Sequence, residues 1–588
     1  MPFDPTPTTD ARDRALFLAS AAVFALAAGL VLIRTLTLNS PIWGGDEYAY
    51  YIAGRAFPDT ASLYVHDDHL QHVNNTLFFW LVHWGFRLFG YAEGWVKALN
   101  LVFFFAAAVL LFSVAGRQGG RGPAMAVTAV AALIPFSGYA ASVMPDALYC
   151  CLCAALIRVM AVDLAVRPVR ASAVAGLLLG LLLLTKPHAL SLILALWAAF
   201  AALAVHPRGL RPRIALQGCL VATAVMAASI VLIKMLLTGA VEHRLIDLLG
   251  VFYANVVIGY GGVSHNILPD ILRSLGAHLV LLLLVAGPAI ALMTAQVLRG
   301  WRGDAPATDD PDQRNRLFLA VFVLLALGGA TAMTAVFTAE LVGAGVVKPW
   351  HDIYTRYNEF LIPFALLMLP AASGAGCSRT AIRIGAALSL AAALFWWLRG
   401  GTLFHMYPWN VTGMLAISQT PWAGKAGLAP PSLFLALACA TQIATLLRPQ
   451  RALLFGLGFL SLFWTGSTVE ASLWQYQVSG GFSPLAGQAR SVMATLPEED
   501  RDHGLVIGAE RWGRMDFALF GLARDNWILS KPQQDVAIAP GEIPEGTRWI
   551  LTFGRFSLPP SYRTVLDSPP FHLFRPATGP ATAGPAIP

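Results

Sequence analysis

The chain has 588 residues, of which 57% are hydrophobic and only 12% are charged. Soluble domains carry about 25% charged residues, so this composition excludes an ordinary soluble protein and indicates an integral membrane protein. The formal net charge of +7 does not indicate nucleic-acid binding, because the arginines stand between hydrophobic segments and form no basic stripe.

Apolar segments that could cross a bilayer recur through the first four-fifths of the chain. About 20 mostly apolar residues span the hydrocarbon as a helix. The first segment is long for a signal peptide and has no small-residue cleavage site, so we expect it to remain as a helix. The expected fold class is therefore a polytopic α-helical membrane protein with thirteen spans, at residues 15–37, 96–115, 123–140, 144–162, 171–186, 188–205, 214–237, 276–297, 317–338, 358–372, 382–398, 428–446 and 452–468.

The composition changes after residue 470. Short apolar runs at 504–508, 526–530, 548–553 and 571–574 predict strands, and residues 510–523 have helical spacing. We expect three parts: a transmembrane domain over 1–470 with a first loop at 38–95, a small α/β domain over 471–575, and a disordered Pro/Ala/Gly-rich tail over 576–588.

The basic residues predict the orientation of the chain. If the N-terminus is cytoplasmic, the cytoplasmic segments hold seventeen arginines, whereas the longer loops on the opposite side hold nine lysines and arginines. Positive charge accumulates on cytoplasmic loops, so this bias favours a cytoplasmic N-terminus. An odd number of spans then places the first loop and the C-terminal domain outside the cytoplasm.

The stretch PIWGGDEYAYYIAGR, residues 41–55, brings two adjacent acids, Asp46 and Glu47, to the extracytoplasmic membrane surface. One interpretation is a solvated acid or the start of a helix, where a carboxylate stabilises the helix dipole. The other is a functional carboxylate. The same loop also contains five potential metal ligands, His66, Asp67, Asp68, His69 and His72, which are of the types that bind a divalent cation.

Cations also occur on the disfavoured extracytoplasmic side. Lys186 lies before Pro187 at the end of the fifth span, where a lysine either extends to the lipid surface or binds an anion. The loop before the tenth span contains Lys348, His351, Arg356 and Tyr357. These side chains suit either anchoring at the lipid interface or binding of a phosphate or diphosphate, by the Arg fork and the Lys point charge.

Together these residues favour glycosyl transfer. A carboxylate can act as the general base that deprotonates an acceptor hydroxyl. Cations can stabilise a lipid phosphate that leaves with negative charge.

At this point the sequence resembles the GT-C integral membrane glycosyltransferases. It is similar to the bacterial aminoarabinose and galacturonic acid transferases and to the protein mannosyltransferases. The resemblance rests on four stretches in order: DEYAYYIAGRAF followed by NNTLFFWLVHWGFRLFG, then SVMPDALYCCLCAALI, LLLGLLLLTKPHALSLILAL and IYTRYNEFLIPFALLMLP.

The resemblance implies inverting transfer from a polyprenyl-phosphate sugar, with Asp46 as the base, Glu47 assisting, and Lys186 and Arg356 binding the donor phosphate. Two departures affect the other contacts. The family has an arginine shortly after the acid pair, whereas here only the later Arg55 fits. It also has a Glu-Lys pair before the loop tryptophan, where this chain has HVNN before Trp80. Asp67, Asp68, His69 and His72 are the candidates to replace the missing contacts with a Mg²⁺ or Mn²⁺ site; the alternative is that no metal is bound.

Two other functions fit a chain of this class. A transporter or lipid flippase is expected to have charged or broken-helix features near the bilayer midplane and internal repeats. No inverted repeat is apparent, and the ionisable residues gather on one face. An O-antigen-type polymerase or ligase would use a diphosphate-linked donor and rely on Arg- and His-rich loops.

Overall fold

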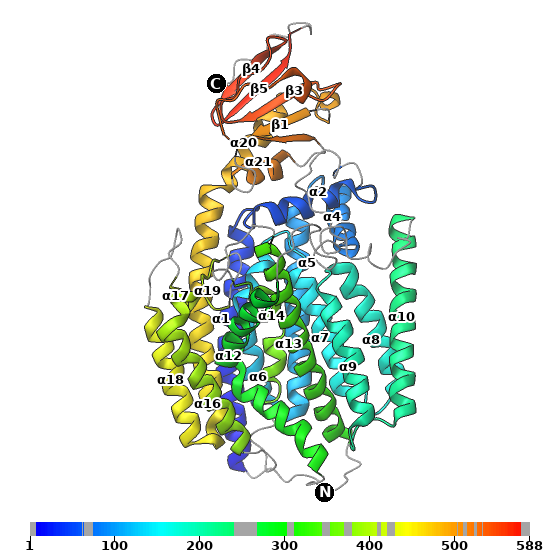
Figure 1. The fold of residues 1–588 in the computed structure, drawn as a ribbon, viewed down its shortest axis with the longest axis vertical. Coiled ribbons are helices and arrows are strands. Elements are labelled where there is room, and N and C mark those ends of the chain that lie inside the picture. Colours follow the sequence, from blue (N-terminus) through cyan, green and yellow to red (C-terminus); the bar gives the residue numbers. More distant parts are fainter. Residues whose placement is uncertain are drawn as a thin grey trace.

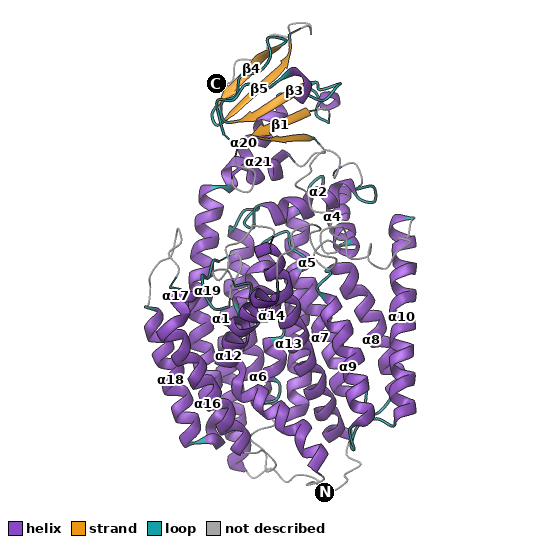
Figure 2. Ribbon diagram, in the orientation of Figure 1, coloured by secondary structure: helices purple, strands orange, loops and turns teal. Residues whose placement is uncertain are grey.

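The computed structural model describes the chain in segments. These are residues 7–60, 63, 75–239, 267–302, 311–343, 353–369, 379–408, 413–419, 430–502, 504–509, 514–522, 526–531 and 533–577. Figures 1 and 2 show a bundle of roughly parallel and antiparallel helices with a small sheet domain at one end. The N-terminus lies at the opposite end of the bundle. We call the end that carries the sheet the domain end.

The elements of the bundle follow the apolar segments of the sequence. The helices up to residue 238 are α1 (Pro7–Thr37), α2 (Gly45–Ala56), α4 (Thr76–Phe89), α5 (Glu93–Gly119), α6 (Arg121–Ala132), the 3₁₀ helix η1 (Pro135–Ala141), α7 (Asp146–Val162), α8 (Pro168–Thr185), α9 (Ala189–Val205) and α10 (Pro212–Thr238). The remaining helices of the bundle are α12 (Leu268–Arg302), α13 (Pro311–Gly343), α14 (Arg356–Glu359), α15 (Ile362–Leu366), α16 (Arg379–Phe395), the π-helical η4 (Trp396–Gly400), α17 (Gly401–Leu403), the 3₁₀ helix η5 (Leu415–Ile417), α18 (Pro431–Leu447), the 3₁₀ helix η6 (Pro449–Arg451) and α19 (Ala452–Gly481).

Eight helices in the described part of the chain are long and apolar enough to cross a membrane, and α9 and α18 are shorter apolar helices. This confirms a polytopic helical membrane protein, while the count of thirteen spans stays a prediction. Two predicted spans are not continuous helices. Segment 123–140 divides into α6 and η1, which begins at Pro135, and the described residues 358–369 of the other segment lie in or after the short helices α14 and α15. A proline lacks the N–H that helix continuation needs, and Pro135 stands at this break.

In the described part of the first loop, helices α2 and α4 lie at the domain end of the bundle, below the sheet domain (Figure 1). These helices pack closely, because a Cβ on Gly54 of α2 would lie 2.3 Å from Cγ1 of Val82 in α4. On another face of α2, the ring of Tyr51 stacks on Phe520 of the C-terminal domain at 4.3 Å between centroids. The helix that contains the acid pair is therefore packed between the bundle and the domain.

The C-terminal domain is a mixed five-stranded sheet with helices on it. Its elements are α20 (Ser483–Ala494), the 3₁₀ helix η7 (Glu498–Asp500), β1 (Gly504–Gly508), α21 (Arg514–Leu522), β2 (Trp527–Ser530), the 3₁₀ helix η8 (Pro540–Glu542), β3 (Trp549–Phe553), β4 (Tyr562–Ser568) and β5 (Phe571–Pro576).

The strand order is β2-β1-β3-β5-β4. β1 pairs in parallel with β2 and β3, with Val506 opposite Ile528 and Leu551, whereas β5 is antiparallel to β3 and β4. The four apolar runs and the intervening helix predicted from the sequence are thus confirmed. β4 was missed, because as an edge strand it is largely exposed and has no apolar run. Helix α19 continues through residue 470, so one continuous helix leads from the bundle to the domain.

Candidate active site

Asp46 lies in the first turn of α2, where the chain leaves the end of α1 through a turn at Gly44. Gly44 has φ +53°, a conformation that glycine adopts without steric cost. The Asp46 side chain is 45% exposed, and its Oδ2 accepts a hydrogen bond from Nη1 of Arg356 at 3.2 Å. The two residues are 310 positions apart in the sequence, so tertiary packing alone brings the predicted base to a predicted phosphate-binding cation.

Arg356 begins the short helix α14 and makes a second contact with its neighbour Tyr357. Its Nη2 donates to the Tyr357 hydroxyl at 2.9 Å, and its guanidinium carbon lies 4.9 Å from the centre of the Tyr357 ring. The Tyr357 ring also stacks on His188, at 4.1 Å between centroids. The aromatic ring therefore links Arg356 to the loop between α8 and α9.

Lys186, in that same loop, is buried and forms an ion pair. Its Nζ lies 2.7 Å from Oδ1 of Asp146, the first residue of α7, and 5.8 Å from the centre of the Tyr357 ring. The other carboxylate oxygen of Asp146 is buried and has no hydrogen-bond partner among the residues that the structure describes. An acceptor left without a donor in a buried site is costly, and a ligand hydroxyl or amine could occupy that position.

We call Asp46, Asp146, Lys186, His188 and Arg356 the charged cluster. It contains two carboxylates and two cations. Burial lowers the pKa of His188 well below its usual value, and Lys186 and Arg356 lower it further, so the imidazole is neutral at pH 7. The cluster is therefore close to neutral as a whole, and each cation has a carboxylate partner that an incoming anion must replace.

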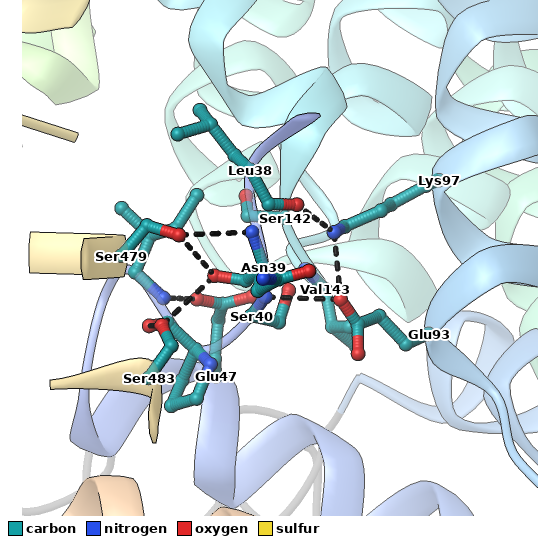
Figure 3. Close-up of polar contacts among 12 residues, drawn as sticks. Leu38, Asn39, Ser40, Glu47, Glu93, Lys97, Ser142, Val143, Ser479 and Ser483 are labelled. Carbon is teal, nitrogen blue, oxygen red and sulfur yellow. Dashed lines mark hydrogen bonds and ion pairs between the residues drawn. The ribbon is translucent and has the colours of Figure 1, made fainter. Parts of the chain in front are cut away.

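Glu47 is adjacent to Asp46 in the sequence but occupies a different environment. It is fully buried. Its Oε1 accepts the N–H of Val143 at 2.6 Å and its Oε2 that of Trp43 at 2.9 Å and that of Ile42, so it joins the loop before α2 to the loop before α7 (Figure 3). Burial raises the pKa of Glu47, while the three backbone donors and the Lys97 ammonium oppose that rise. Glu47 thus holds the backbone around the charged cluster, and its assisting role stays a prediction.

The other predicted site residues fall into two groups. Arg55 is described, but it lies nine residues after Asp46 on the same helix, which places it about 13 Å along the axis and on the opposite face. Its guanidinium lies 5.5 Å from the centre of the Phe86 ring, so the structure does not bring it to the charged cluster.

Six further residues lie outside the described part of the chain: Lys348, His351, Asp67, Asp68, His69 and His72. Within the described part, no group of three or more His, Cys, Asp or Glu residues could hold a metal ion.

Two residues of the charged cluster were not among the predicted site residues. Asp146 and His188 lie in the short turns SVMPD and TKPHAL, between apolar helices. Both turns are short and lie at the end of the bundle that also carries Asp46. Ionisable residues in such turns are the sequence feature that could have identified these two site residues. The residues that pair with Asp146 and His188 are known only from the tertiary structure, which brings the loops together.

We expect Glu47→Gln to lower the free energy of unfolding by about 1–3 kcal/mol, because an amide NH₂ replaces an oxygen that accepts a buried N–H. Thermal unfolding of the detergent-purified protein measures this effect. The matched control is Glu499→Gln, at an exposed acid of the C-terminal domain, which should unfold like the wild type. Equal stability of both variants would show that the Glu47 contacts do not hold the loop.

No family model matches the chain, and no curated protein matches it. Among solved structures, the chain is similar to the crystal structure of ArnT from Cupriavidus metallidurans bound to undecaprenyl phosphate. The TM-score is 0.50 at 15% sequence identity, and the match covers 95% of this chain and 99% of that chain.

Two further structures are more distant. The apo state of the same ArnT matches with a TM-score of 0.45 at 14% identity, over 95% of this chain and 98% of that one. The apo oligosaccharyltransferase of Archaeoglobus fulgidus matches with a TM-score of 0.40 at 11% identity, over 87% and 64%. The match to undecaprenyl-phosphate-bound ArnT extends over nearly the full length of both chains, and it shows that this multi-pass membrane protein has a GT-C-like fold.

Proposed function

We propose that the protein is a glycosyltransferase that moves a sugar from a polyprenyl-phosphate donor to the hydroxyl group of an extracytoplasmic acceptor. The acceptor would be a cell-envelope glycan, a lipid or a protein. The observation that carries this proposal is the half-exposed Asp46 carboxylate, held 3.2 Å from Arg356 at the domain end of the bundle. The ArnT whose fold this chain shares is bound to undecaprenyl phosphate in its crystal structure, which supports a lipid phosphate as the leaving group.

In this proposal Asp46 is the general base. The acceptor oxygen attacks the anomeric carbon of the sugar from the face opposite the phosphate, and Asp46 takes the hydroxyl proton. The new glycosidic C–O bond forms as the bond between the anomeric carbon and the phosphate oxygen breaks. The bonding electrons leave with the polyprenyl phosphate, and the configuration at the anomeric carbon is inverted.

Arg356 and Lys186 would stabilise the phosphate. Each is paired with a carboxylate in this structure, Arg356 with Asp46 and Lys186 with Asp146. A phosphate that binds Arg356 competes with Asp46 for the guanidinium, and the carboxylate is then free to accept a proton. Donor binding would in this way prepare the base. Tyr357 orients Arg356 through its hydroxyl, and Lys348 and His351 stay predicted phosphate contacts.

A divalent metal ion stays a prediction as well. Its proposed ligands, Asp67, Asp68, His69 and His72, belong to the first loop, and a bound cation there would add positive charge near the donor phosphate. The mechanism above uses the side chains of the charged cluster and has no step that depends on the metal.

We also propose that the protein resides in a bacterial inner membrane with the charged cluster outside the cytoplasm. The arginine-rich loops support this orientation. The first loop and the C-terminal domain lie at the same end of the bundle, so both would face the periplasm (Figure 1).

Asp46→Asn should lower kcat for sugar transfer by about 10²–10⁴-fold, because the amide cannot accept the proton. Transfer is measured with a radiolabelled polyprenyl-phosphate sugar and the purified enzyme. Asp163→Asn is the matched control, since Asp163 has a similar exposure of 48% but lies at the other end of α7. Turnover near that of the wild type in Asp46→Asn would remove the general-base assignment.

The same assay distinguishes the alternative functions. A wild type that turns over only a diphosphate-linked donor would indicate a polymerase or ligase, and inertness to both donors would favour a transporter.

Arg356→Lys should raise the KM for the donor and reduce kcat/KM by about 10–100-fold, because the ammonium cannot reproduce two guanidinium hydrogen bonds. Arg273→Lys is the control: Arg273 also pairs with a carboxylate, that of Asp270 at 3.0 Å, but it is not part of the charged cluster. The phosphate assignment fails if Arg356→Lys uses the donor as well as the control does.

The orientation can be tested with reporters fused to the chain. Alkaline phosphatase attached after residue 588 should be active, because it folds only outside the cytoplasm, and green fluorescent protein at the same position should be dark. The opposite result is expected for fusions after residue 448, between α18 and α19. If the two sites exchange these outcomes, the proposed orientation is inverted.

A further inference from the structure

A cavity lies beside the start of the first loop, apart from the charged cluster. It has a volume of about 540 Å³ and lies between the end of α1, the start of α5 and the junction of α19 with α20. None of the charged-cluster residues lines it. We call it the junction cavity, and its lining includes Thr37, Ser40, Glu93, Tyr476, Ser479 and Arg490.

Hydroxyl groups and the guanidinium of Arg490 make the wall of the junction cavity polar. Arg490 is exposed and forms no ion pair with any residue that the structure describes. The Glu93 carboxylate is already engaged, because its Oε1 accepts from Lys97 at 2.7 Å and from the Ser40 N–H at 2.9 Å (Figure 3). The hydroxyl of Ser40 is buried and has no hydrogen-bond partner in the described part of the chain. The wall thus offers a positive charge and unused hydrogen-bonding capacity.

Two helical glycines keep the junction cavity open. Gly480 near the end of α19 and Gly487 in α20 both line it, and a Cβ added to either would meet no heavy atom within 4 Å. Glycine is unfavourable inside a helix, and at these two positions no close neighbour requires it. Side chains at these positions would extend into the cavity, so the glycines preserve its volume.

Apolar surface continues from the cavity into the membrane-spanning part of the bundle. On α1, the exposed Ile33 lies one turn before Thr37, the last residue of the helix, on the same helical face, and Leu36 is exposed beside them. On α19, the exposed Leu473 lies three residues before Tyr476 and seven before Gly480, on the same helical face. The two helices meet here through a hydrogen bond of 2.7 Å between the Thr37 and Tyr476 hydroxyls. A polar cavity above two exposed apolar stripes matches the shape of a lipid, with its head in the cavity and its tails on the stripes.

We propose that the junction cavity binds the phosphate-bearing headgroup of a membrane lipid. Arg490 binds the phosphate by charge-assisted hydrogen bonds, the hydroxyls bind the remaining polar groups of the head, and the acyl chains lie along the exposed faces of α1 and α19. This site is separate from the donor site of the proposed function and does not depend on it.

Native mass spectrometry of the full chain in detergent measures the binding directly. The probes are phosphatidylglycerol, diacylglycerol as the tails without phosphate, and glycerol phosphate as the head without tails. We expect the wild type to retain phosphatidylglycerol in preference to both other probes. Arg490→Ala and Gly487→Leu should each weaken phosphatidylglycerol binding at least about 10-fold, the first by removing the charge and the second by filling the cavity.

Two control variants separate this effect from general damage. Arg563→Ala removes an exposed arginine of β4, and Gly458→Leu adds a side chain at an open helical position of α19 outside the junction cavity. Both should bind phosphatidylglycerol like the wild type. Wild-type binding in Arg490→Ala overturns the proposal, and so does equal retention of diacylglycerol. Equal binding of glycerol phosphate also overturns it, in favour of a site for soluble phosphates. If Gly487→Leu unfolds at a lower temperature than the wild type, its binding result is set aside, and phosphatidylglycerol binding by Arg490→Ala tests the proposal.

Discussion

The buried carboxylate of Glu47 is the contact on which the geometry of the charged cluster depends. One side chain accepts N–H groups from residues 42 and 43, which precede α2, and from residue 143, which precedes α7. Backbone N–H groups in a buried turn must find an acceptor, and an acceptor that serves two segments also fixes their separation. Because Asp46 begins α2 and Asp146 begins α7, the same contact sets the spacing of the two carboxylates in the cluster.

The C-terminal domain is tied to this region by a row of hydroxyl groups. Ser472, Tyr476, Ser479 and Ser483 follow one another along α19 and into α20, and each bonds to α1 or to the loop after it. Arg34 donates to Ser472 at 3.0 Å, and the Asn39 N–H donates to Ser479 at 2.9 Å (Figure 3). The helix that leads to the domain therefore also holds the segment that leads to Asp46. The same hydrogen bonds therefore link the C-terminal domain to the start of the first loop.

In this structure, each cation of the charged cluster is paired with a carboxylate. Exposed ion pairs contribute little to stability, but a buried charge that loses its partner is costly. The half-exposed Asp46 can be released from Arg356 at small cost, whereas the buried Lys186 and Asp146 need a replacement partner. In the proposed function a donor phosphate would supply that partner for Lys186 and Arg356, and the Asp146 carboxylate would then need a hydrogen-bond donor from the bound ligand.

The sequence by itself determined the membrane class, the positions of most helices, four strands of the C-terminal sheet, and the loop that contains the acid pair. These features depend on local composition and periodicity, which a single chain displays directly. Tertiary structure alone decided which of the two adjacent acids faces the site, because consecutive helical residues point about 100° apart and only packing assigns their surroundings. It also decided that Asp146 pairs with Lys186, that Asp46 meets Arg356 across 310 positions, and that Arg55 turns away to Phe86. Contacts between residues far apart in the chain have no local signature, so the partners of the charged groups could not be predicted from the sequence.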